Sequence, residues 1–312
     1  MVSLAGVTIS AKRVQLITER VGATMMRERD AATASFLTSR SKASRPVEPA
    51  ALMVITADGG RVQTRQKEPT QKWKEDKVGV VYDAIPTPEK PGEKYRGPKP
   101  NRRSVTATLA SWDVLGDHLG ALGEKRGYHY ARQKVFISDG ALSIRSLRER
   151  CFPDAVFILD WAHAAEHLNQ CAIAIFGPGP KATRWYERQK ERLWNGHTKR
   201  LIAEIARQSR RQGRPAKSAQ DNDPRRILRN HLTYFRGNRL GLDYPAFRKK
   251  GWPIGSGIIE STIKQIAKRV KGSEKHWTIT GAEETLQVVT QLLSEDDSWQ
   301  NFWRRCPLAS VA

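Results

Sequence analysis

The stretch GWPIGSGIIESTIKQIAKRVKG, residues 251–272, organises the chain around one predicted helix. Gly255, Ser256 and Gly257 give a flexible entry, and Ser256 is expected to cap the first turn. Apolar side chains then recur at helical spacing, at Ile258, Ile259, Ile263, Ile266 and Val270.

The opposite face of this helix is charged in an uneven way. Glu260 stands near its start, and the residues that follow on the same face are Lys264, Lys268 and Lys271. One interpretation is an amphipathic surface helix with a solvated charged face. The other is a helix that binds a metal ion through Glu260 and lies along a phosphate backbone with its lysines.

Composition favours a polyanionic partner. The 312 residues include 54 Lys and Arg against 32 Asp and Glu, a net charge of +22, which indicates nucleic acid. A membrane partner is not expected, because no apolar run approaches the roughly 20 residues that span a bilayer, and no signal-peptide core is present. The three cysteines Cys151, Cys171 and Cys306 are scattered, so we expect no disulfide framework or cysteine zinc site, and a cytoplasmic location.

The first half of the chain predicts a helix followed by strands. Residues 1–45 are expected to form a polar, basic helical segment or linker that Ser10 caps. Three strand candidates follow, ALMVITAD at 51–58, RVQTR at 61–65 and KEDKVGVVYDAI at 74–85, and their short connections predict an antiparallel meander. Residues 86–104, rich in proline, lysine and arginine, are expected to be a mobile basic loop.

From residue 110 the pattern alternates between helix and strand, which indicates parallel strands. A helix over 110–127 precedes the strands QKVFIS and DAVFIL, each followed by another helix. Three meander strands followed by this alternation give the element order of a ribonuclease H-like α/β fold, a mixed sheet flanked by helices. We assign its core to residues 46–180 and 251–293, with a C-terminal tail at 294–312.

Residues 181–250 interrupt this core with a large basic insertion. They contain 20 Lys and Arg and 6 Asp and Glu, a net +14, interleaved with aromatic side chains. We predict an all-helical insertion with a loop near residues 210–224. A solvated helical bundle is the alternative, but the unbalanced charge favours contact with nucleic acid.

Two apolar strands end in Asp-Gly, at Asp58 and at Asp139. Acids at strand ends point into the crevice where α/β folds bind ligands. Together with Glu260 they form three carboxylates that repel one another unless cations neutralise them. Hard oxygen ligands suit Mg²⁺ or Mn²⁺, and two such ions about 4 Å apart can promote attack on a phosphodiester.

Asp160, at the end of ILDW, is a rival acid. His163, Glu166 and His167 follow it, and the two histidines share a helix face. The cluster is a candidate metal site, although a tetrahedral zinc site lacks a further ligand nearby. A structural network or a DNA contact at the root of the insertion is the favoured interpretation.

Four motifs, in this order and spacing, resemble a DDE-type bacterial insertion-sequence transposase, and most closely the ISKra family. They are ITADGG, FISDGA, LDWAHAAEHL and WPIGSGIIESTIKQIAKRVKGSEKHW, which carries the most specific part, GSG-x-x-E. The family's core is similar to that of Mutator-like elements, with a helical insertion before the final Glu. Such transposases are usually longer at the N-terminus, so three alternatives stay open here: a truncated copy, a fragment and a natural short form.

The resemblance implies that Asp58, Asp139 and Glu260 are catalytic and bind two Mg²⁺ or Mn²⁺ ions, and that Asp160 and His163 match an accessory Asp-x-x-His motif. It implies DNA strand cleavage and strand transfer by a homo-oligomer at the bacterial nucleoid. The expected DNA-binding residues are Lys264, Lys268, Arg269, Lys271, Arg210 and Arg211. Two alternatives stay open: a DNA-binding transposase remnant without catalysis, and a ribonuclease H-like nuclease acting on RNA or branched DNA.

Overall fold

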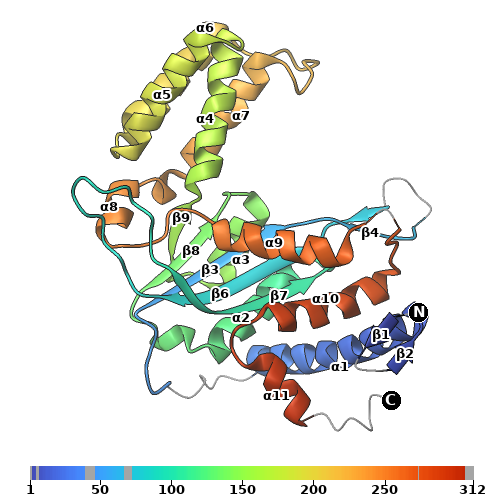
Figure 1. The fold of residues 1–312 in the computed structure, drawn as a ribbon. Coiled ribbons are helices and arrows are strands. Elements are labelled where there is room, and N and C mark those ends of the chain that lie inside the picture. The colour runs from blue at the N-terminus through green and yellow to red at the C-terminus, as the bar shows by residue number, and fades with distance from the viewer. Residues whose placement is uncertain (1, 5–6, 39–45, 67–71, 273, 306–312) are drawn as a thin grey trace.

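The computed structural model describes residues 2–4, 7–38, 46–66, 72–272 and 274–305. It shows a mixed sheet with helices on both faces, and a helical lobe that projects from one end of the sheet (Figure 1). We define the helical lobe as residues 161–249, which contain helices α4 to α8. In the described part of the chain, no helix is long and apolar enough to cross a membrane.

The central sheet has five strands in the order β7-β6-β3-β8-β9. The first three along the chain pair antiparallel, whereas β8 and β9 run parallel to β3. The strands are β3 (Leu52–Gly59), β6 (Lys77–Ala84), β7 (Pro100–Thr108), β8 (Lys134–Ser138) and β9 (Val156–Leu159). The predicted α/β class with a mixed, helix-flanked sheet is therefore confirmed.

The predicted meander was wrong in its second strand. Residues 61–65 contribute only β4 (Val62–Gln63), which pairs with β5 (Trp73–Lys74) in a separate ribbon. The third meander strand is β7, in the segment that we expected to be a mobile basic loop. Because β7 lies at the sheet edge, its exposed first half can carry Arg102 and Arg103. These charged residues made the segment resemble a loop in the sequence.

The rest of that basic segment is also held in place. The Thr87 N–H donates to the Gly251 carbonyl at 3.0 Å, and the Tyr95 hydroxyl donates to the Trp252 carbonyl at 2.5 Å. Arg248 forms an ion pair with Glu89 at 2.9 Å. Residues 86–99 therefore pack against the segment that leads into the predicted helix of residues 251–272.

Strand alternation separates two apolar layers. Met53 and Ile55 face α2 (Trp112–Lys125) and α3 (Leu142–Cys151). Leu52 and Val54 face the other layer, which includes α9 (Gly257–Val270) and α10 (Ile279–Leu293). This second layer is continuous with the core of the helical lobe, so the lobe and the sheet share one apolar interior.

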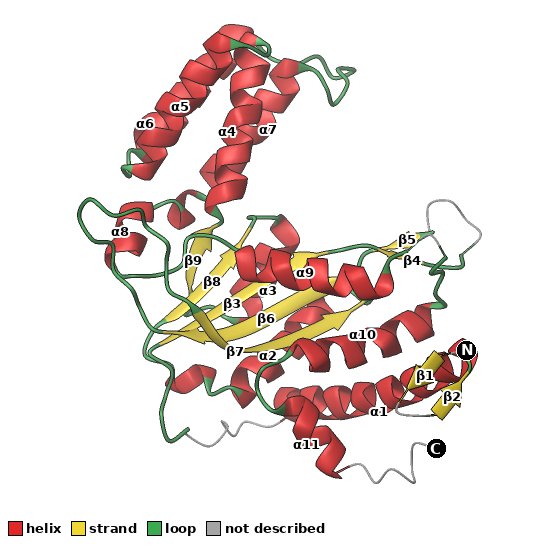
Figure 2. Cartoon of the chain, viewed as in Figure 1, coloured by secondary structure: helices red, strands yellow, loops and turns green. Residues whose placement is uncertain are grey.

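The lobe helices are α4 (Trp161–Phe176), α5 (Pro180–Trp194), α6 (Thr198–Gln212), α7 (Pro224–Gly237) and α8 (Tyr244–Lys249). Helices α4 to α7 stand beside one another and extend away from the sheet (Figure 2). Residues 213–223 connect α6 to α7 without helix, where the sequence predicted a loop.

The two ends of the chain add elements that the sequence did not reveal. The predicted N-terminal helix is α1 (Ala11–Thr38), with the Ser10 hydroxyl accepting from the Arg13 N–H at 3.2 Å, but a hairpin of β1 (Val2–Leu4) and β2 (Val7–Ile9) precedes it. The expected tail contains a further helix, α11 (Ser298–Arg305). Cys306 and residues 39–45 lie outside the described residues; Cys151 and Cys171 are free thiols.

Candidate active site

Three acids occupy equivalent positions at the ends of neighbouring parallel strands. Thr56 of β3 lies opposite Ile137 of β8, which in turn lies opposite Ile158 of β9. Two residues further along each strand come Asp58, Asp139 and Asp160. The strand-end positions predicted for these acids are confirmed, and the three acids form a row along one edge of the sheet.

Glu260 approaches this row from the helix above it. Helix α9 crosses β3 and β6 on the face that carries Leu52 and Val54, with Ile259 and Ile266 in the same apolar layer. Burial raises the pKa of Asp58, and the negative charges of Asp139 and Glu260 raise it further. The three carboxylates therefore lie on one face of the sheet and within electrostatic range of one another.

His163 supplies a positive charge beside the carboxylates. Its Nδ1 lies 3.1 Å from Asp160 Oδ1, which also accepts the His163 backbone N–H at 2.8 Å. This side-chain hydrogen bond raises the pKa of His163 to about 9, with smaller contributions from the charges of Asp139 and Asp58. The imidazole is therefore protonated at neutral pH.

Asp160 connects the lobe to the start of α9. Burial opposes its ionisation, but hydrogen bonds from His163 and Ser256 outweigh that effect and lower the pKa of Asp160. The Ser256 N–H donates to Asp160 Oδ2 at 2.5 Å, and the Trp161 N–H donates to the Ile254 carbonyl at 2.9 Å. Asp160 thus caps α4 and fixes the entry to α9 at the same time.

Two expectations from the sequence differ from the structure. Ser256 stands at the N-cap of α9 but makes no side-chain cap hydrogen bond, because its side chain and its backbone N–H both bond to Asp160. His167 does not join Asp160 and His163, because it turns to His231, with 2.8 Å between the two Nδ1 atoms. The cluster at the root of the lobe is a hydrogen-bonded network, as the favoured interpretation allowed.

The donor set fits a hard cation. Asp58 Oδ1 accepts the Gly59 N–H at 2.7 Å and Asp139 Oδ1 accepts the Ala141 N–H at 2.9 Å, which orients both carboxylates. Glu260 is partly exposed, and its carboxylate lies 4.0 Å from Lys264 Nζ. Among the described residues, no three His, Cys, Asp or Glu side chains already lie close enough to hold a metal ion together. Cation binding by Asp58, Asp139 and Glu260 stays a prediction.

An open groove of about 720 Å³ adjoins the acids. Asp58 and Asp139 line it together with residues that the sequence analysis missed: Arg61, Trp73, Glu75, Trp112 and Ser143. Burial raises the pKa of Asp76, which follows Glu75 in the chain, to about 6. The Gly59-Gly60 turn was a local signal for Glu75 and Asp76, because the lack of side chains there lets these two carboxylates approach closely.

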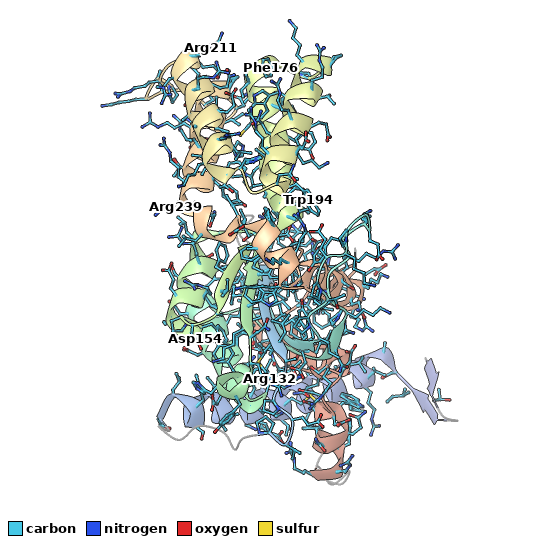
Figure 3. All side chains as sticks on the ribbon, turned by 90° about the vertical axis from the view of Figure 1, so that its left-hand side faces the viewer. Arg132, Asp154, Phe176, Trp194, Arg211 and Arg239 are labelled. Carbon is cyan, nitrogen blue, oxygen red and sulfur yellow. The ribbon has the colours of Figure 1, made fainter. Side chains whose placement is uncertain are left out.

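The predicted DNA-binding residues fall into two separate places. Lys264, Lys268 and Arg269 are exposed on α9, where Lys264 Nζ lies 4.0 Å from the Glu260 carboxylate, and Lys271 follows the end of this helix. Arg210 and Arg211 are exposed at the end of α6. Figure 3 places Arg211 at the outer end of the lobe and Arg239 near its inner end, so the structure does not bring Arg210 and Arg211 to the acids.

The chain matches no model of a known protein family, and no curated protein is similar enough to count as a match.

Proposed function

We propose that this chain is a DDE-type DNA transposase with a ribonuclease H-like catalytic core. The observation that carries the proposal is the placement of Asp58 and Asp139 at adjacent strand ends, with Glu260 on a helix over the same face. The strand order β7-β6-β3-β8-β9, antiparallel and then parallel, supports the ribonuclease H-like assignment. The likeness of four sequence motifs to ISKra transposases supplies the reaction class.

Asp58, Asp139 and Glu260 would hold the divalent cations, Mg²⁺ or Mn²⁺, which activate an attacking oxygen and stabilise the leaving oxygen of a phosphodiester. The side chains have distinct parts in this scheme. Asp160 fixes the start of α9 and thereby the height of Glu260 above the sheet. Protonated His163 offsets part of the negative charge when no cation is bound. Lys264 and Lys268 hold phosphates of the DNA beside the acids.

The proposed partners are transposon ends and target DNA, held by a homo-oligomer associated with the nucleoid. The net charge of +22 supports a nucleic acid partner, because so large an excess of cations attracts a polyanion. Exposed arginines at the outer end of the lobe, Arg210 and Arg211, would contact DNA away from the reacting phosphate.

A DNA-binding remnant without catalysis is the second candidate. The observation that favours it is the lack of a preformed metal-holding group among the described residues. The two candidates make the same prediction for DNA binding and opposite predictions for cleavage, so one pair of variants separates them.

The test compares the wild-type chain with Glu260→Gln on DNA that carries the element's ends, with Mg²⁺, with Mn²⁺ and with chelator. Glutamine keeps the size of the side chain and removes its charge. We expect Glu260→Gln to bind DNA at least as well as wild type, since a negative charge beside lysines is lost. We expect its cleavage to fall by at least about 100-fold, because even indirect supports of metal ligands have effects near that size.

Glu166→Gln is the matched control, an exposed carboxylate on α4 that should leave cleavage unchanged. If neither wild type nor Glu260→Gln cleaves and both bind DNA, the remnant is the correct function. Cleavage of RNA or branched DNA in place of transposon ends would identify a nuclease instead.

A further inference from the structure

The inner end of α7 closes over the turn that carries Asp139. The Tyr234 hydroxyl donates to the Asp139 backbone carbonyl at 2.6 Å. One turn later, the buried Asn238 side chain donates to the Tyr234 carbonyl at 3.1 Å and to the Gly140 carbonyl at 3.5 Å. Two consecutive carbonyls of the acid-bearing turn are therefore held by one helix of the lobe.

Gly140 shows how closely the two surfaces fit. Its φ of +81° lies in the left-handed region, which glycine adopts without strain. A Cβ atom at this position would lie 2.7 Å from Asn238 Nδ2. The turn after β8 is thus shaped to receive the end of α7.

Tyr234 is itself held from behind. Its ring stacks on His167 with 3.7 Å between ring centroids, and His167 Nδ1 lies 2.8 Å from His231 Nδ1. Burial lowers the pKa of both histidines to about 4, so both are neutral and one can donate to the other. Burial, followed by the nearby charge of Asp139, raises the pKa of Tyr234, so its hydroxyl remains a donor.

We infer that Tyr234 is a positioning residue which, with Asn238, fixes the turn after β8 so that the Asp139 carboxylate stays opposite Asp58. The catalytic importance of the Asp139 carboxylate rests on the proposed function, whereas the position of this carboxylate does not. A basic lobe that only bound polyanions would not need a tyrosine directed at the backbone of this turn. The lobe therefore completes the site in addition to carrying positive charge.

The experiment compares full-length wild type, Tyr234→Phe and the control Tyr128→Phe. Both substitutions remove one hydroxyl and keep the ring. Tyr128 is a suitable control because it packs in the other apolar layer, where its hydroxyl donates to Asp154. One measurement needs neither DNA nor metal. It is hydrogen–deuterium exchange, which compares the amides of residues 139–143 with those of residues 135–137 in β8.

In Tyr234→Phe we expect faster exchange in residues 139–143 and unchanged exchange in β8, because the lost hydrogen bond holds the turn and not the strand. Tyr128→Phe should match wild type in both segments. Unchanged exchange in residues 139–143, or an equal increase in β8, would overturn the positioning role.

Cleavage assays keep this inference separate from the proposed function. Where wild type cleaves DNA, Tyr234→Phe should need several-fold more Mn²⁺ for half-maximal rate at an unchanged DNA affinity, and an equal requirement would overturn the role. Where wild type does not cleave, the proposed function fails, and hydrogen–deuterium exchange still decides the positioning role.

Discussion

Asp160 is the residue on which most of the site's internal order depends. It is buried, and it accepts hydrogen bonds from His163 and Ser256. In Asp160→Asn the charge is lost, so the pKa of His163 should fall from about 9 toward its ordinary 6.5. NMR titration of the imidazole measures this, with Glu166→Gln as the control. A His163 pKa that stays near 9 in Asp160→Asn would contradict the assignment.

The same pair predicts a pH dependence of stability. A histidine whose pKa is raised on folding stabilises the protein fully below its unfolded pKa of about 6.5, and this contribution is lost as pH rises through about 9. Since 35% of the His163 side chain is exposed, screening limits the effect to about 1–2 kcal/mol. Urea unfolding at pH 6.5, 8 and 9.5 should show this decline in wild type, whereas Asp160→Asn should lack it.

For single residues, the sequence predicted the positions of Asp58 and Asp139 but not the hydrogen bonds that hold the surrounding turns in place. Asp58 and Asp139 were recognisable because each follows an apolar strand and precedes glycine. Tyr234 was not, because it donates to a backbone carbonyl 95 residues away, and a carbonyl leaves no trace in sequence. A local rule predicted that Ser256 caps α9, but its side chain and its backbone N–H both bond to Asp160, a buried carboxylate from another element.

Helix α9 was interpreted either as a surface helix with a solvated charged face or as a helix that lies along a phosphate backbone. Removing its positive charges distinguishes the two interpretations. If α9 lies along a phosphate backbone, Lys264→Ala with Lys268→Ala should reduce the slope of log affinity against log salt by about 1.8, at roughly 0.9 for each lost contact. The control is Lys12→Ala with Arg13→Ala, which removes the same charge from exposed positions at the start of α1. Equal slopes for the two double variants would show that the α9 lysines are only a solvated face.

Deleting residues 181–250 would be a poor test of the lobe, because elements from this segment support the sheet. Tyr234 holds the turn after β8, the Tyr244 hydroxyl donates to the Leu159 carbonyl at 3.0 Å, and Arg248 pairs with Glu89. Loss of activity in such a deletion would mix DNA contact with site assembly. Arg210→Ala with Arg211→Ala changes only exposed side chains at the outer end and isolates the proposed contact with DNA.

The prediction of helices and strands succeeded where burial sets the pattern of apolar residues, and it failed where the structure depends on which strands pair. The apolar runs of β3, β8 and β9 and the periodic faces of α2 and α9 predicted those elements from residue type alone. Residues 61–65 look like a strand, yet β3 pairs with β6 and leaves them to a short ribbon. Strand β7 was hidden because an edge strand needs only one buried half.

Helix α1 joins helices from the two faces of the sheet. It packs against α2 and α10, which lie on opposite faces. Gly22 permits the contact with α10, because a Cβ there would lie 2.0 Å from the Glu284 carbonyl oxygen. Arg29 links the Glu283 side chain to the Ala107 carbonyl. The sequence predicted this helix but not its partners, because its mixed surface gave no sign of two separate contacts.

Three histidines, of which His118 and His231 are buried and His167 is half-buried, predict how the folded chain responds to acid. His118, between α1 and α2, and the pair His167 and His231 in the lobe each have a pKa lowered to about 4, chiefly by burial. The unfolded chain therefore binds more protons than the folded one between about pH 6.5 and 4. Stability should fall as pH decreases through this window, by up to about 3 kcal/mol for the buried His118.

Asp76 works in the opposite direction, because its pKa is raised to about 6 and the folded state binds its proton first. A comparison between variants cancels the contribution of Asp76 to the pH dependence of stability, because Asp76 is present in all of them. Urea unfolding from pH 7 to 4.5 should show a shallower decline for His118→Gln than for wild type, since glutamine has no proton to gain. The exposed His197→Gln should follow wild type. If His118→Gln declines as steeply as wild type, His118 is not kept neutral by the packing of α1 on α2.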